Sequence, residues 1–118
     1  ACGLSQILDV MREKQEIREL RIIGGGAKSR LWKQILADVC NVTLHDVSTF
    51  FDSATSLGAA AAAGVGIGLF RDLQEACSHI STSGDVEPDP ETQAVYALTK
   101  KRYAMLYPSL KEAFHTRA

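Results

Sequence analysis

A run of three glycines, residues 24–26, separates a short apolar segment from an amphipathic one and constrains the fold more than any other feature. Residues 19–23 end in two β-branched side chains and stop at the glycines, which predicts a β-strand. Apolar side chains return at helical spacing after Ser29, which predicts an α-helix with Ser29 as its N-cap. Backbone amides and the positive end of a helix dipole favour a bound anion at such a turn. A tight turn without a ligand explains the same residues equally well. We call residues 24–29 the glycine turn.

The rest of the chain alternates between helical and strand patterns. One apolar face at helical spacing predicts a helix over residues 4–15, and alternation over residues 42–47 predicts a second strand. Further elements are expected in the second half, namely helices over 53–65, 69–80 and 91–107, a loop over 81–90 and an interruption at Pro108. Strands that alternate with helices favour a parallel sheet. Two strands are fewer than the usual about five or six, so we expect a piece of a larger domain.

The composition argues against several classes of function. The 118 residues carry 13 Lys and Arg against 14 Asp and Glu, with 46% hydrophobic and 23% charged residues. The chain therefore lacks the basic excess with which proteins bind nucleic acid or an anionic membrane surface. Residues 59–70 are too short and too rich in glycine to span a bilayer, and no signal peptide is visible. We expect a cytoplasmic protein with neither nucleic acid nor a membrane as a partner.

Cysteine and histidine side chains form no recognisable constellation. The three cysteines and three histidines lack zinc-ligand spacing, so the cysteines are interpreted as small apolar residues in a reducing compartment. The phosphate-loop motif fails because Ala27 precedes Lys28. The dinucleotide motif of a Rossmann-like oxidoreductase fails because the three glycines are contiguous, which makes that function a weak alternative.

Three segments of the chain, taken in order, carry a resemblance to a known family. They are G-G-G-A-K-S over residues 24–29 with L-W-x-Q-I-x-A-D over 31–38, S-L-G-A-A over 56–60, and E-P-D-P over 87–90 with Y-P-S-L-K over 107–111. They resemble the adenosine-binding segment, the next helix and the C-terminal tail of the FGGY carbohydrate kinases. Within that family the resemblance is greatest to bacterial xylulokinases.

The resemblance implies an α/β fold, a partial ribonuclease-H-like (actin-like ATPase) domain with two parallel strands and several helices. Residues 1–118 would be the nucleotide-side half of the second actin-like domain of a sugar kinase. ATP would lie in the cleft between two such domains, with Mg²⁺. By the same resemblance, Gly25 and Gly26 would face the ADP phosphates through their backbone, Ala27 would lie close to the nucleotide, and Ser29 would lie near the adenine or ribose. No catalytic residue and no metal ligand is implied in this chain, because the family's catalytic aspartate lies in the first half of the enzyme.

The implied activity of the intact protein is the transfer of phosphate from ATP to D-xylulose, with ADP as the second product. A kinase of another sugar or polyol, such as gluconate, ribulose or glycerol, is the alternative. The 118 residues alone are expected to be inactive. A different alternative is a non-catalytic actin-like module that forms a homo-oligomer through the open edge of strand 19–23.

Other residues near the turn have structural explanations. Trp32 is expected in the core beneath its helix, and Asp38 is expected to have a structural role. Asp46 is expected to end a strand, and neither aspartate is expected to be the catalytic base. Tyr103 and Tyr107 are expected to pack against the fold rather than to stack on bases.

Overall fold

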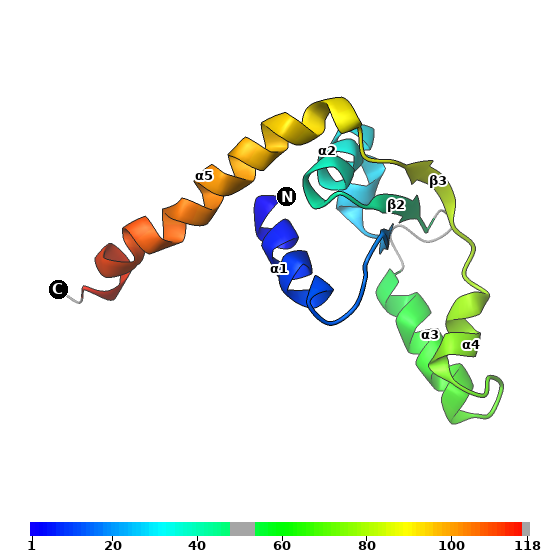
Figure 1. Cartoon of the computed structure of the whole chain (residues 1–118). Helices are drawn as coiled ribbons and strands as arrows, with labels where there is room; N and C mark the ends of the chain where they lie inside the picture. Colours follow the sequence, from blue (N-terminus) through cyan, green and yellow to red (C-terminus); the bar gives the residue numbers. More distant parts are fainter. Residues whose placement is uncertain (48–53, 117–118) are drawn as a thin grey trace.

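The structure is a computed structural model that describes residues 1–47 and 54–116. It has an α/β fold in which α1 and α2 pack together beside a small sheet, while α5 and the pair formed by α3 and α4 extend away from it (Figure 1). The elements are α1 (Cys2–Arg12), β1 (Glu19–Ile22), the short 3-10 helix η1 (Gly25–Lys28), α2 (Arg30–Cys40), β2 (Thr43–Asp46), α3 (Ala54–Gly66), α4 (Leu73–Ser78), β3 (Ser83–Val86) and α5 (Pro90–His115). The expected α/β class is confirmed.

The sheet has the strand order β1-β2-β3. β1 and β2 are parallel and in register from Glu19 opposite Thr43 to Ile22 opposite Asp46, as the strand–helix–strand pattern predicts. β3 is antiparallel to β2 and lies where the sequence predicts only a loop, so the prediction of two strands is wrong by one. The pattern could not reveal β3 because only one large apolar side chain lies in it.

The hydrophobic core lies between α1, α2 and one face of the sheet. Its buried side chains come from both helices and from the segment that ends in β2: Leu8, Leu36, Ala37, Cys40, Val42 and Leu44. Leu20 and Ile22 of β1 pack against this cluster, because alternate residues of a strand share a face. The buried thiol of Cys40 therefore behaves as a small apolar side chain, as expected.

The predicted ends of α2 are confirmed. Ser29 is the N-cap, since its Oγ accepts a hydrogen bond from the backbone N–H of Trp32 at 3.2 Å. Asn41 follows the last turn in the left-handed conformation, with φ of 50°, which ends the helix. The caps suggested for α3, Asp52 and Ser53, lie outside the described residues.

The helices of the second half differ from their predicted bounds. α4 is much shorter than the expected helix over 69–80. α5 continues through Pro108, where an interruption was predicted. Proline removes one backbone donor, and Ser109 donates its hydroxyl to the carbonyl of Met105 at 2.7 Å in the same turn. The prediction that Tyr107 packs against the fold is wrong, because 60% of its surface is exposed.

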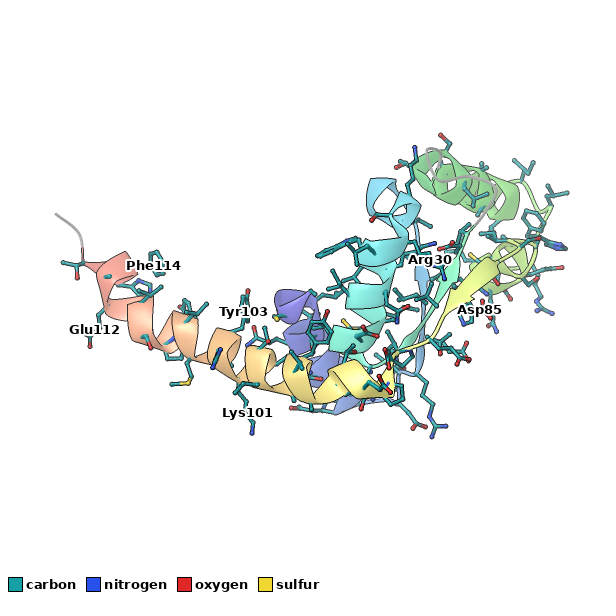
Figure 2. The ribbon with its side chains drawn as sticks, turned by 90° about the horizontal axis from the view of Figure 1, so that it is seen from above. Arg30, Asp85, Lys101, Tyr103, Glu112 and Phe114 are labelled. Carbon is teal, nitrogen blue, oxygen red and sulfur yellow. The ribbon has the colours of Figure 1, made fainter. Side chains whose placement is uncertain are left out.

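The molecule is more extended than a compact domain of its length. Its radius of gyration is 18.0 Å, whereas about 13.5 Å is typical of a compact chain of this size. Figure 2 shows Tyr103 directed from α5 towards α1 and Phe114 at the far end of α5, away from the sheet. Large apolar side chains on α1 and α5, including Ile7, Val10 and Leu106, are exposed in this chain. No helix in the described ranges is long and apolar enough to cross a membrane.

Arg12 ties the end of α1 to the end of α2. Its guanidinium donates to the carbonyls of Ile17 at 3.1 Å, Cys40 at 2.9 Å and Asn41 at 3.1 Å. We expect Arg12→Met to lower the free energy of unfolding by about 2 kcal/mol, because it leaves partly buried carbonyls without donors. Urea denaturation would measure the change. Arg18→Met is the matched control, since Arg18 forms only an exposed ion pair, and a loss as large as that of Arg12→Met would contradict the explanation.

Candidate functional site

The glycine turn lies at the edge of the sheet where the parallel strands end. β1 ends at Ile22 and β2 at Asp46, which are opposite each other, and the backbone N–H of Val47 donates to the carbonyl of Ile22 at 3.4 Å. Ligands of open α/β sheets bind outside the carboxyl ends of the strands. The sequence therefore places its three glycines at the edge where a ligand is expected.

The structural constraints that require glycine differ among the three positions of the turn. Gly24 has φ of +84°, a conformation that other residues rarely adopt. Gly26 lies against an indole, because a Cβ added there would be 3.3 Å from Cδ1 of Trp32. Gly25 has neither reason, since its φ is ordinary and none of the residues 1–47 and 54–116 lies within 4 Å of the position of an added Cβ. The fold thus leaves open space over Gly25.

Backbone amides point out of this turn in two places. Within the turn, the N–H of Ala27 donates to Gly24 at 3.0 Å and the N–H of Ser29 donates to Gly26 at 3.3 Å. The first amides of a helix have no carbonyl in a preceding turn to donate to, which applies to Gly25 and Gly26 in η1 and to Arg30 in α2. α2 is an 11-residue helix, and the positive end of its dipole favours an anion here.

All four residues implied for nucleotide binding lie within the glycine turn. Gly25 and Gly26 belong to η1 and Ser29 caps α2. Ala27 is only 1% exposed, so it lies beneath the turn and supports it. The Oγ of Ser29 accepts from Trp32, and its hydroxyl hydrogen is still able to donate to a ligand. Their contacts with a nucleotide stay predictions.

The charges at the start of α2 oppose helix stability and favour an anion. Its first turn carries Arg30 and no acidic residue, whereas the positive end of a helix dipole is stabilised by acidic side chains. Figure 2 shows Arg30 beside the start of α2. A bound anion would relieve this unfavourable arrangement.

Lys33 is held by a buried ion pair with Asp46 at the end of β2. Their side chains are 12% and 11% exposed. β3 passes close to this pair, because a Cβ added at Gly84 would lie 3.1 Å from Oδ2 of Asp46. The other oxygen of Asp46, Oδ1, is buried without a hydrogen-bond partner among the described residues. The pair fixes α2 against the sheet directly beside the glycine turn, and Asp46 ends β2, as expected.

Asp38 has the structural role that the sequence suggests. It is 5% exposed, and its Oδ1 accepts from Nε2 of Gln34 at 2.9 Å and from the backbone N–H of Asp89 at 2.8 Å. This carboxylate therefore attaches the start of α5 to α2 and is not available for phosphoryl transfer.

Trp32 is the residue near the site that sequence reasoning placed wrongly. It is 40% exposed rather than buried in the core, and its ring lies against Gly26. Helical side chains lean towards the N-terminus of their helix. Because Trp32 follows the N-cap by three residues, its indole leans back over the glycine turn. This spacing from the N-cap is the sequence signal that could have located Trp32 at the turn.

His45 connects the three strands on the opposite face of the sheet. Its Nδ1 lies 2.7 Å from Oδ1 of Asp85 on β3, and its Nε2 lies 3.3 Å from Oε2 of Glu19 on β1. The hydrogen bond to Asp85 raises the pKa of His45 above its ordinary value, and the negative charges of both carboxylates act in the same direction. Burial opposes this shift. Within residues 1–47 and 54–116, no group of three His, Cys, Asp or Glu side chains could hold a metal ion.

Residues 1–67 match the C-terminal domain of the FGGY family of carbohydrate kinases, and the chain therefore belongs to this family. It is 37% identical over 108 residues to the autoinducer-2 kinase of Salmonella typhimurium and 36% identical over 108 residues to that of Yersinia pestis. Each of these alignments covers 91% of this chain and 20% of the relative. The chain thus spans about a fifth of the length of these curated relatives.

Solved structures of the same family share the fold. The xylulose kinase from Lactobacillus acidophilus has a TM-score of 0.78 and 22% identity, with 93% of this chain and 22% of that chain covered. The gluconate kinase from Lactobacillus acidophilus has a TM-score of 0.74 and 23% identity, with 88% of this chain and 21% of that chain covered. The expected actin-like fold class is confirmed by these likenesses.

The ion pair between Lys33 and Asp46 generates a stability prediction. We expect Asp46→Ala to lower the free energy of unfolding by about 3 kcal/mol, because it leaves the Lys33 ammonium buried without its partner. Replacing both residues, as Lys33→Met with Asp46→Leu, should cost less than the single change. Urea denaturation of both variants would measure this, and a larger loss in the double variant would contradict a buried ion pair.

The raised pKa of His45 predicts that the free energy of unfolding depends on pH. Its interactions with Asp85 and Glu19 stabilise the fold fully below the pKa of His45 in the unfolded chain. This stabilisation is lost as pH rises through the higher folded-state pKa. The free energy of unfolding should therefore fall across about pH 6 to pH 8, as measured by urea denaturation. His45→Gln should flatten that dependence, and an unchanged slope in this variant would assign it to other groups.

Proposed function

We propose that this chain is the nucleotide-side part of the second actin-like domain of an ATP-dependent carbohydrate kinase. Its glycine turn would hold the diphosphate of ATP and ADP, with Gly25 and Gly26 approaching the phosphates through their backbone. Ser29 would contact the adenosine side, and Ala27 would support the turn from below. This proposal concerns the whole protein of which the chain would form about a fifth.

One observation carries the proposal. In a chain of the FGGY family, the glycine turn stands at the carboxyl edge of two parallel strands and leaves open space over Gly25 that the fold itself does not require. Glycine at such a position allows a phosphate to approach the main chain without meeting a Cβ. Arg30 and the positive end of the α2 dipole favour the same anionic group.

The described residues do not supply a site for Mg²⁺. Mg²⁺ prefers oxygen ligands, and no suitable group of carboxylates lies together in the described ranges. In phosphoryl transfer the metal bridges phosphate oxygens and neutralises their charge. We propose that the protein groups serving Mg²⁺, and the aspartate that would deprotonate the acceptor hydroxyl, lie outside this chain.

Two kinds of similarity support different acceptors for the phosphate. The residues of the glycine turn and of the tail resemble those of xylulokinases, which supports D-xylulose. The curated relatives at 37% identity are named for autoinducer-2, whereas the xylulose kinase of known structure shares 22% identity. The higher identity supports autoinducer-2 as the acceptor, with D-xylulose, gluconate, ribulose and glycerol as further acceptors to compare. ATP consumption by the intact protein with each acceptor would decide between them.

Gly25→Ala tests the nucleotide site. The fold accommodates a Cβ there, so the free energy of unfolding should stay constant or rise by up to about 1 kcal/mol. The affinity for ADP, measured by calorimetry, should fall about tenfold because the methyl group stands where the phosphate would approach. Gly66→Ala is the matched control, since its added Cβ also meets nothing within 4 Å, at the far end of α3.

The unmodified chain provides the decisive comparison. We expect weak binding of ADP by the 118 residues and no ATP turnover, because one wall of a cleft binds but does not complete the reaction. Absence of heat with millimolar ADP would contradict the nucleotide site. If the chain then formed oligomers in size-exclusion chromatography, the alternative of a non-catalytic interaction module would be supported, because β1 pairs on one side only.

A further inference from the structure

Trp32 is the only tryptophan of the chain, and it stands at the rim of the glycine turn. It lies three residues beyond the N-cap Ser29, and 40% of its surface is exposed. The pyrrole edge of its indole faces Gly26, because a Cβ added at Gly26 would lie 3.3 Å from Cδ1 and 3.4 Å from Nε1. The edge that carries the N–H is therefore next to the proposed phosphate site.

Trp32 stands outside the hydrophobic core. α2 buries its core side chains one to two turns further along, at Leu36, Ala37 and Cys40, and Trp32 is not part of that cluster. An indole is a large apolar group whose exposure forgoes the stabilisation of burial. The indole instead lies against the backbone of Gly26, which places its N–H edge at the glycine turn.

The indole N–H is also available as a donor. Tryptophan Nε1 donates a hydrogen bond and cannot accept one. The hydrogen bond described for Trp32 uses its backbone N–H, which donates to Oγ of Ser29. Among residues 1–47 and 54–116, the indole N–H has no acceptor.

We propose that the indole N–H of Trp32 donates a hydrogen bond to a phosphate oxygen of the nucleotide bound at the glycine turn. The inference rests on the proposed function and adds a side-chain donor to the backbone amides of Gly25 and Gly26. It also gives a reason for glycine at residue 26, because a Cβ there would require the indole edge to shift by a few tenths of an ångström. Hydrogen bonds to an ionised acceptor are the strong class, so a single donor has a measurable effect on affinity.

The test compares ADP with adenosine, which lacks the phosphates. Trp32→Phe retains an aromatic ring on α2 but loses the N–H donor. We expect this variant to bind ADP about tenfold more weakly, while its affinity for adenosine stays the same. Calorimetry on the 118-residue chain at millimolar ligand measures both. In the unmodified chain the emission of Trp32 should change with ADP and much less with adenosine, because no other tryptophan contributes.

Two further variants separate this role from a general effect on the fold. Gly26→Ala should also weaken ADP binding selectively, because its methyl group would lie 3.3 Å from Cδ1 of Trp32 and shift the indole edge by a few tenths of an ångström. Tyr107→Phe is the matched control. It removes one polar donor from a 60% exposed aromatic residue on α5, and it should leave both affinities unchanged. Circular dichroism of each variant establishes that the helices are retained.

The outcomes are distinguishable. Equal ADP affinity in Trp32→Phe and the unmodified chain would overturn the proposal for Trp32 and leave the proposed nucleotide site in place. An equal loss for ADP and adenosine would also overturn it, since the ring rather than the N–H would then contact the ligand. Failure of the unmodified chain to bind either ligand would overturn the nucleotide site itself, and the Trp32 proposal with it.

Discussion

The parallel pairing of β1 with β2 is the constraint on which the rest of this structure depends. Two parallel strands cannot be joined by a tight hairpin, so the chain must return along a helix before the second strand begins. α2 is that helix, and its inner face supplies half of the buried core cluster, Leu36, Ala37 and Cys40. The crossover also requires an abrupt change of direction after Ile22. The glycine turn makes that change at the same edge where ligands of such sheets bind, so one local requirement produces both the fold and the candidate site.

Local signals in the sequence were sufficient for the elements around the turn and insufficient beyond it. Ser29 and Asn41 announce the ends of α2 because capping is a property of a few neighbouring residues. β3 depends instead on pairing with β2, some 40 residues earlier in the sequence, and its own side chains carry no strand pattern. The four candidate site residues could be placed together from the turn alone. The position of Trp32 could not be predicted from the turn alone. Its hydrophobicity suggested burial, and only the direction in which helical side chains lean indicates that it lies at the rim of the glycine turn.

Around the turn, the chain departs repeatedly from what stability alone would select. Arg30 stands at the positive end of α2, Asp46 keeps a buried oxygen without a partner among the described residues, and Trp32 is 40% exposed. Proteins that specify one structure usually satisfy all local rules, and departures gather where a function is served. On the opposite face, His45 lies between the carboxylates of Asp85 and Glu19, and its Nε2 is likewise buried without a hydrogen-bond partner among the described residues.

The outer half of α5 has a thermodynamic consequence that follows from its isolation. Beyond Tyr103 the helix has no buried residue and carries a proline, and its remaining 12 residues, Ala104 to His115, extend about 18 Å from the last contact with α1. The stability of helices in proteins comes mainly from tertiary packing, and this outer segment has no buried side chain to provide it. This segment would therefore fray first on warming. A partner surface that covers Leu106 and Phe114 would have to offset the conformational entropy that this segment loses when it becomes ordered. Binding and helix formation there would therefore occur together, as a single cooperative event.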